Sequence, residues 1–238
     1  MLQTRTPKIL TDRKRPTANR GKLNLAACRI YFDFDNTISP FDVLDDLISR
    51  FAVNKDWLVI EKAWEEGSID AKTCLEGQLR LIRATREEME DYLSHIQIDP
   101  HFIHLVDLLR SEGSSPVILS DSFSRFIYFI LEKNGITDVP VHANEINVTA
   151  NRWVPSFPYY GKGCAKCAHC KKQHLIKEPN FMTIYIGDGR SDICAAEVAD
   201  IVFAKGTLLK YMVQNHHACF AFKNLRSVYH TFKEWLHA

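Results

Sequence analysis

Three short apolar runs along the chain each end in polar, mostly acidic positions. Each run has four or five residues rich in β-branched or aromatic side chains, which predicts a buried strand rather than a helix. A further strand of this kind is predicted at residues 201–204. The runs and the polar residues that follow them are 28–32 with Asp33 and Asp35, 116–119 with Ser120 and Asp121, and 182–186 with Asp188.

Apolar residues repeat at helical spacing in the segments between these runs. Residues 43–96 hold several such stretches and no strand-like run, and the polar sequence Thr85-Arg86-Glu87-Glu88 is typical of a helix start. Short strand-like pieces are predicted within 139–158 and 219–222. Further helices are predicted at 102–113, 123–134, from the segment 161–172 to about Lys177, at 192–199, and from Leu225 onward.

Strands that alternate with helices indicate an α/β protein, a Rossmann-like three-layer fold with a parallel sheet and helices on both faces. The helical block between the first and second strands is too long for a single crossover. It is therefore predicted to be a small inserted cap at 43–99, with the core formed by 23–42 and 100–238.

The composition is that of an ordinary globular protein. The 238 residues are 46% hydrophobic and 25% charged, with a formal net charge of +1, so neither nucleic acid nor a membrane surface is an expected partner. No run approaches the roughly 18 apolar residues of a membrane span. We expect a cytoplasmic protein because no signal peptide is recognisable. The expected oligomeric state is a monomer or a homodimer.

The first 22 residues differ from the rest of the chain. They carry seven Lys or Arg against one acid, Asp12, and they lack apolar periodicity. A disordered basic tail is the expected structure. An organelle transit peptide is the alternative, although Ser is absent from these residues and no amphipathic pattern is present.

The acidic strand ends are the candidate site. The carboxyl ends of parallel strands line one crevice, where ligands bind. Several carboxylates that converge there repel one another unless a cation compensates them, and oxygen ligands suit Mg²⁺. A single Asp at a strand end is often only a helix cap or turn residue, but three such ends together favour a site.

The sequences YFDFDNT at 31–37, LSDS at 119–122, Lys171 and YIGDGRSD at 185–192 resemble, in this order, the four motifs of the haloacid dehalogenase-like phosphatases. The resemblance covers residues 28–205. It implies that Asp33 is the nucleophile that forms an aspartyl-phosphate, and that Asp35 is the general acid and base. It also implies a phosphate contact for Ser120 and a charge-neutralising role for Lys171, with the adjacent Lys172 as the alternative.

The same resemblance implies a Mg²⁺ cofactor and a small phosphorylated metabolite as substrate. Its metal ligands would be Asp33, the Asp35 carbonyl, Asp188 and Asp192, partly through water. The residues expected to contact the substrate are Asp42, Asp121, Ser122 and Gly189.

Within this superfamily the helical insertion resembles the subgroup that contains phosphoserine phosphatase. Asp42 and the run HANEINVTANRWVPSFP resemble the methionine-salvage phosphatases acting on 2-hydroxy-3-keto-5-methylthiopentenyl-1-phosphate, our first expected substrate. Ser120-Asp121 and YIGDGRSD also resemble the phosphoethanolamine/phosphocholine phosphatases, and carboxylates suit a cationic amine. Asp121 stands where the salvage family has Gly, so the amine phosphates and phosphoserine remain alternatives.

Three cysteines, Cys164, Cys167 and Cys170, form a C-x-x-C-x-x-C run with His169 and His174 close by. A Cys₃His zinc site is one interpretation, and oxidised pairs or free thiols are the other. A zinc-binding or regulatory module without catalysis is accordingly the alternative from another functional class. The other cysteines are expected to be small buried hydrophobic residues: Cys28, Cys74, Cys194 and Cys219.

Overall fold

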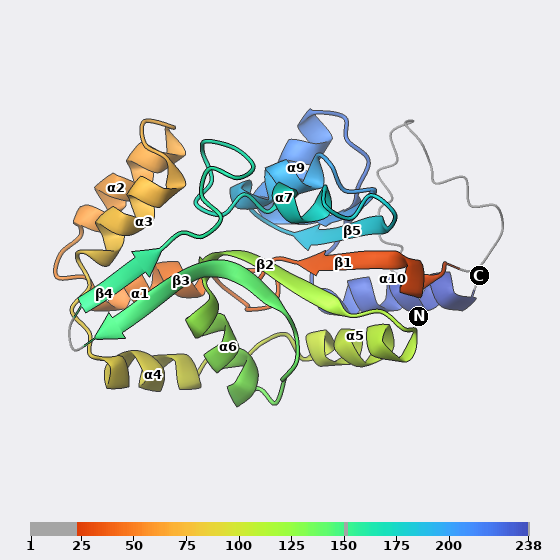
Figure 1. The fold of residues 1–238 in the computed structure, drawn as a ribbon, viewed down its shortest axis with the longest axis horizontal. Coiled ribbons are helices and arrows are strands. Elements are labelled where there is room, and N and C mark those ends of the chain that lie inside the picture. Colours follow the sequence, from red (N-terminus) through yellow and green to blue (C-terminus); the bar gives the residue numbers. More distant parts are fainter. Residues whose placement is uncertain (1–22, 150–151, 238) are drawn as a thin grey trace, which may run out of the picture.

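Seven strands form one sheet in the computed structural model, which describes residues 23–149 and 152–237. The strand order is β4-β3-β2-β1-β5-β6-β7, and neighbouring strands are parallel except for β3 and β4, which pair antiparallel. The α/β fold expected from the sequence is confirmed (Figure 1). The strands are β1 (Cys28–Phe32), β2 (Pro116–Phe123), β3 (Val141–Thr149), β4 (Arg152–Ser156), β5 (Met182–Gly187), β6 (Ile201–Ala204) and β7 (Phe220–Ala221).

The first strand lies at the centre of the sheet, and the chain builds outward from it in both directions. From β1 the chain adds β2, β3 and β4 on one side, and it then returns to place β5, β6 and β7 on the other. Phe32, the last residue of β1, is level with Ile118 of β2 and Ile186 of β5. The carboxyl ends of these three parallel strands therefore meet where the strand order reverses, the usual binding crevice of such sheets.

Helices cover both faces of the sheet (Figure 1). Successive residues of β1 alternate between the faces: Ile30 and Phe32 belong to the main apolar cluster, and Tyr31 packs with Leu119 and Tyr185 on the opposite side. The first face carries α5 (Pro100–Ser111), α6 (Ser124–Lys133) and α10 (Leu225–His237), and the other carries α7 (Lys172–Leu175), α8 (Ile193–Ala196) and α9 (Gly206–Gln214).

Five helices and no strand lie between β1 and β2, and the first four of them fall within 43–96, as the periodicity of that segment predicts. The expected polar helix start is a capping box, in which the Thr85 hydroxyl accepts from the Glu88 N–H. Buried residues of α1 and α4 belong to the same apolar cluster as the strands, whereas α2 buries no residue fully. The first four helices are α1 (Val43–Phe51), α2 (Asp56–Glu65), α3 (Ala71–Leu79) and α4 (Arg86–Ser94).

Some elements differ from the sequence prediction. The helix expected from 161–172 to Lys177 is only the single turn α7, because the preceding segment is a Gly- and Cys-containing loop. The helix expected at 192–199 is a 3₁₀ turn, η2 (Arg190–Asp192), followed by the short α8. Helix α9 was not predicted, although its two buried residues, Leu208 and Met212, lie one turn apart. A short η1 (Leu25–Ala27) precedes β1.

The predicted basic tail, residues 1–22, lies outside the described residues. Among the described residues, no helix combines the length and the apolar character that a membrane crossing requires.

Candidate active site

Asp33 and Asp35 are held by the backbone immediately after the central strand. The Asp33 N–H donates to the carbonyl of Ile186 at 2.9 Å, which continues the β1–β5 ladder by one residue. Between the two acids and α1 the chain turns back sharply, with Asn36 at φ 56°, a left-handed conformation that Asn tolerates better than most residues. A carboxylate oxygen of Asp35 accepts from the Val43 N–H at 2.9 Å, at the first turn of α1.

Lys171 lies beneath these acids and is fully buried. Its ammonium donates to Asp33 Oδ1 at 2.5 Å, to Asp192 Oδ1 at 2.6 Å and to Ser191 Oγ at 3.3 Å. Burial opposes the charge, but Asp192 and Asp33 outweigh it and raise the pKa of Lys171. Of the two candidate lysines, Lys171 is therefore the one that reaches the strand-end acids, and Lys172 begins α7 partly exposed.

Asp192 is an internal anchor of the loop after β5. One oxygen, Oδ1, accepts from Lys171 and from the Tyr185 hydroxyl at 2.5 Å. The other, Oδ2, accepts from the backbone N–H groups of Asp188 at 2.8 Å and Gly189 at 2.9 Å. These four hydrogen bonds fix Lys171 and the backbone of the β5 loop relative to each other.

The carboxylates of Asp33, Asp188 and Asp192 meet closely enough to share a cation. One oxygen from each lies within 4.8 Å of the others. Burial and then Asp192 raise the pKa of Asp188 to about 6, and burial, Asp192 and further carboxylates raise the pKa of Asp33 despite Lys171. Such a crowded oxygen set, with more negative charge than Lys171 neutralises, suits Mg²⁺. Because both Asp192 oxygens are occupied by hydrogen bonds, Asp33 and Asp188 are better placed as direct ligands.

Strand β2 contributes Ser120, Asp121 and Ser122, all of them at the crevice. The Ser120 hydroxyl oxygen accepts from the Ser122 N–H at 3.0 Å and is buried with it. Asp121 Oδ1 is buried without a hydrogen-bond partner among the described residues, and burial raises the pKa of this carboxyl to about 7. An unpartnered buried carboxylate oxygen at a cavity is suited to a donor from a ligand.

A cavity of about 190 Å³ opens above these strand ends and beneath α1, α2 and α3. Its floor includes the predicted residues of the sheet edge, and its roof is acidic, with Asp42, Asp45 and Glu61 beside Trp64. The Arg190 guanidinium lies 5.5 Å from the Trp64 ring and donates to the Glu65 carbonyl at 2.6 Å, so it joins the β5 loop to α2. The volume is below the usual range of about 300–1,000 Å³ for drug-sized ligands, so the cavity admits only a small ligand.

Most residues predicted from the sequence converge on this cavity. Lys171 and Asp192 are instead fully buried and do not line it; Lys171 contacts Asp33, and an oxygen of Asp192 lies within 4.8 Å of one of Asp33. The predicted residues that line the cavity are Asp33, Asp35, Asp42, Ser120, Asp121, Ser122, Asp188 and Gly189.

Several residues of the site were missed at the sequence level. Tyr185 could have been recognised because a buried tyrosine needs a partner for its hydroxyl, and Arg190 because it lies within YIGDGRSD. Nothing in the sequence indicates a functional role for the roof residues Asp45, Glu61 and Trp64, because the pattern of their helices is that of ordinary amphipathic segments.

The prediction for Cys194 was wrong. This cysteine is only partly buried and joins Cys164, Cys167 and Cys170 in one cluster. The two histidines considered as zinc ligands lie elsewhere: His169 Nδ1 is 2.9 Å from the Ser120 carbonyl oxygen, and its Nε2 is 2.8 Å from Nε2 of His174. The fourth member of the cluster is therefore a cysteine from another segment.

Comparisons with known proteins agree with this fold and site. A 2-hydroxy-3-keto-5-methylthiopentenyl-1-phosphate phosphatase of Brevibacillus brevis is 26% identical over 189 residues, 75% of this chain and 83% of that protein. Pdp3-interacting factor 1 of Schizosaccharomyces pombe is 25% identical over 201 residues, 76% of this chain and 84% of that protein.

A solved substrate-bound phosphoserine phosphatase has the same fold, with a TM-score of 0.65 and 23% identity over 84% of this chain and 95% of that one. The haloacid dehalogenase-like hydrolase family matches residues 30–197, more than half of the chain. The match spans every strand end that forms the cavity floor. The resemblance inferred from the motifs is thus confirmed, and the chain belongs to the haloacid dehalogenase-like hydrolases.

Proposed function

We propose that this hydrolase is a Mg²⁺-dependent phosphomonoesterase that acts on a small phosphorylated metabolite through an aspartyl-phosphate at Asp33. The observation that carries the proposal is the buried Lys171 ammonium, 2.5 Å from Asp33 Oδ1, beneath a small cavity. Such a cation orients one carboxylate oxygen and leaves the other available for attack. The phosphatase names of relatives from Brevibacillus brevis and Exiguobacterium sibiricum support the same reaction class.

In the first step, an Asp33 oxygen attacks phosphorus while the bond from phosphorus to the leaving oxygen breaks. Asp35 donates a proton to that oxygen, which departs as an alcohol. Burial and then the neighbouring Asp42 raise the pKa of Asp35, so this carboxyl retains a proton for the transfer.

In the second step, water attacks the phosphorus of the aspartyl-phosphate and Asp35 accepts a proton from it. The bond from phosphorus to the Asp33 oxygen breaks, which regenerates the carboxylate and releases inorganic phosphate. Lys171 and the Ser120 hydroxyl are the groups that neutralise and hydrogen-bond the phosphoryl oxygens. A Mg²⁺ ion held by Asp33, Asp188 and the Asp35 carbonyl, when bound, would supply further positive charge there.

We assign residues 43–99 the role of a cap over this site, with 23–42 and 100–238 as the catalytic core. The roof of the cavity comes from α1, α2 and α3, and Arg190 connects the core loop to the Glu65 carbonyl at the end of α2. A cap in this place would exclude bulk water and strengthen the electrostatic interactions below it.

The first candidate substrate is 2-hydroxy-3-keto-5-methylthiopentenyl-1-phosphate, which several relatives at 24–27% identity carry in their names. A second candidate, a phosphorylated amine such as phosphoethanolamine or phosphocholine, is favoured by the charges of the cavity. Asp42, Asp45 and Glu61 line the same cavity as Trp64, and an aromatic face with carboxylates suits an ammonium group. Phosphoserine carries the same amine together with a carboxylate, which this acidic roof disfavours.

The reaction is tested by trapping the intermediate. Wild-type protein quenched in acid during turnover is expected to carry one phosphoryl group on the peptide that contains Asp33, as detected by mass spectrometry. Asp33→Asn should lose both the label and the turnover. The matched control is Asp107→Asn, an exposed acid on α5 away from the cavity. Unchanged turnover in Asp33→Asn contradicts the proposal.

The substrate is tested with a panel that contains the salvage phosphate, phosphoethanolamine, phosphocholine, phosphoserine and ethyl phosphate. Asp121→Gly supplies the residue expected in the salvage family and removes a carboxylate that lines the cavity. If the amine phosphates are the substrates, their kcat/KM should fall in this variant while that of ethyl phosphate changes little. A preference for the salvage phosphate in both proteins would select the first candidate.

A further inference from the structure

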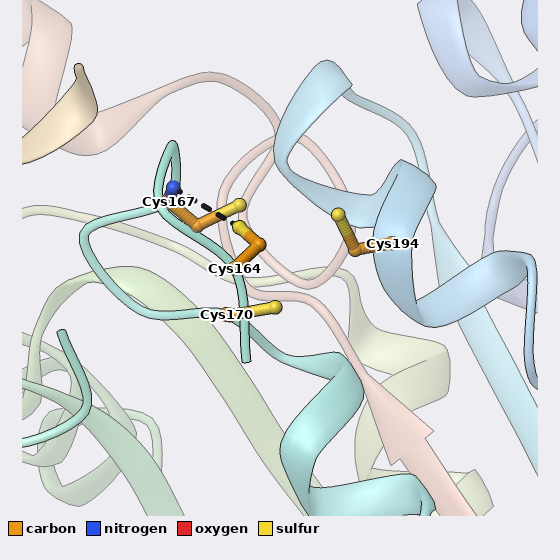
Figure 2. A group of neighbouring side chains, drawn as sticks. All are labelled: Cys164, Cys167, Cys170 and Cys194. Carbon is orange, nitrogen blue, oxygen red and sulfur yellow. Dashed lines mark hydrogen bonds between the residues drawn. The ribbon is translucent and has the colours of Figure 1, made fainter. Parts of the chain in front are cut away.

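Four cysteine sulfurs come together beside the candidate active site. Cys164, Cys167 and Cys170 lie in the loop before α7, and Cys194 is the second residue of α8. Their Sγ atoms all lie within 4.8 Å of one another. Figure 2 shows the four side chains directed from two separate segments toward a common centre.

The spacing of these sulfurs suits a tetrahedral metal. A zinc–sulfur bond of about 2.3 Å places tetrahedral sulfurs about 3.8 Å apart, so only a modest contraction of the cluster is needed. A disulfide joins sulfurs in pairs at about 2.05 Å, and pairing does not account for four thiols around one point. All four cysteines are free thiols in the structure.

The local backbone is also shaped around the sulfurs. The Cys167 N–H donates to Cys164 Sγ at 3.3 Å, and such a donor favours the thiolate form of its acceptor. Gly163 lies so close to Cys170 that an added Cβ would be 2.6 Å from its Sγ. The loop thus leaves room for a cluster of sulfurs and supplies one of the hydrogen bonds that a metal–thiolate site requires.

Soft thiolate ligands select a different ion from the carboxylates of the cavity. Four thiolates are the ligand set of structural zinc, whereas Mg²⁺ prefers oxygen. We propose that Cys164, Cys167, Cys170 and Cys194 bind one structural Zn²⁺ ion. The site differs from the Cys₃His set suggested by the sequence, because its fourth ligand comes from a segment 24 residues further along the chain than Cys170.

The position of the site gives it a second consequence, which rests on the proposed function. Cys170 directly precedes Lys171, and Cys194 follows Asp192 by two residues. A zinc ion there connects the two segments that carry the 2.6 Å ion pair. The four cysteines would accordingly be positioning residues for Lys171 and the β5 loop.

Metal content tests the site directly. The full-length protein is expressed in medium with added zinc and without a histidine tag. After gel filtration it is expected to retain one zinc per chain, as measured by elemental mass spectrometry. Cys194→Ser should lose most of this zinc. The matched control is Cys219→Ser, a change at a buried cysteine outside the cluster, which should retain it.

Cobalt provides a readout that does not depend on the variants. When Co²⁺ replaces zinc in the wild-type chain, the absorption spectrum should show intense charge-transfer bands from thiolate to cobalt. It should also show the visible bands of a tetrahedral sulfur site. Thiol reagents should leave four more cysteines unreacted in the zinc-loaded folded protein than in the same protein after zinc removal by a chelator.

The proposal is overturned by wild-type protein that contains no zinc and gives no cobalt–thiolate spectrum, or by disulfide bonds within the cluster of freshly purified protein. Asp33→Asn should keep its zinc, so a failure of the proposed phosphatase activity leaves this result readable on its own.

Discussion

Lys171 and Asp192 form an ion pair of 2.6 Å between two side chains that are both fully removed from solvent. The same ammonium is 2.5 Å from Asp33, so one buried cation joins carboxylates that follow two different strands of the sheet. Burial of a charge is costly unless opposite charges and hydrogen bonds compensate it. Asp192 meets this condition through hydrogen bonds to Lys171, Tyr185 and two backbone N–H groups, and it thereby fixes the floor of the cavity.

Replacement of this cation should damage both folding and activity. Lys171→Met leaves Asp33 and Asp192 buried without their counter-charge, a change that typically costs about 3–5 kcal/mol. We expect a loss of this size in the free energy of unfolding, measured by urea denaturation, and no detectable turnover. Lys172→Met is the matched control, because Lys172 is partly exposed. Equal stability of the two variants would contradict the ion-pair assignment.

Helix α9 supports the site from the far side of the β5 loop. Gly206, its first residue, has φ +53°, and a Cβ there would lie 2.9 Å from the Asp188 carbonyl oxygen. Gly135 also has a left-handed φ of +75°, but a Cβ at that position meets nothing within 4 Å. A comparison of alanine substitutions at the two positions therefore distinguishes the effect of backbone strain alone from the effect of strain together with a clash against Asp188.

Both glycine-to-alanine variants should lose about 1–2 kcal/mol from left-handed strain. Gly206→Ala should lose more than Gly135→Ala in thermal unfolding, and it alone should reduce kcat, because the clash displaces the backbone of Asp188. If both variants keep wild-type kcat, the contact between α9 and Asp188 is not important for the reaction.

The strand ends of the site were predictable because each of them is encoded locally. An apolar run followed by Asp33, by Ser120 or by Asp188 carries its own signal, and the parallel topology then brings the three ends together. The capping box at Thr85 was recognisable for the same reason, since its two partners are three residues apart.

What could not be predicted depends on contacts between distant segments. Cys194 has no neighbouring cysteine in sequence, so only the packing of α8 against the loop before α7 reveals its partners. Asp45 and Glu61 are polar residues of ordinary helices until the fold places them above the cavity. The choice between Lys171 and Lys172 likewise required knowing which side chain points inward.

The acidic roof predicts a pH dependence that is specific to amine-bearing substrates. Burial, then Asp42 and Glu61, raise the pKa of Asp45 to about 7. Below this pH Asp45 is mostly protonated and neutral, and above it the carboxylate is available to an ammonium group. The ratio of kcat/KM for phosphoethanolamine to that for ethyl phosphate should therefore rise as the pH increases through 7.

A rise of about fivefold is expected, equivalent to roughly 1 kcal/mol for a partly exposed ion pair. Ethyl phosphate corrects for ionisation of the phosphate and of the groups on the cavity floor, because both substrates share them. The measurement is a set of initial rates on both sides of neutral pH for the wild type and for Asp45→Asn. The rise should be smaller in the variant, in which Asp121, whose pKa burial raises to about 7, still titrates at the same cavity. A flat ratio in the wild type would count against an amine substrate.

Removal of divalent cations should abolish turnover and lower thermal stability together. Without a cation the carboxylates of Asp33 and Asp188 repel each other, and the pKa of both is raised. A bound ion stabilises the folded state by about 2.7 kcal/mol at a hundred times its dissociation constant, so Mg²⁺ added to chelated protein should raise the melting temperature. Asp188→Asn should lose most of this increase, while Asp107→Asn should keep it.

Ca²⁺, which takes more ligands at longer distances, should restore less activity than Mg²⁺. Full turnover after thorough chelation would exclude a metal at this site.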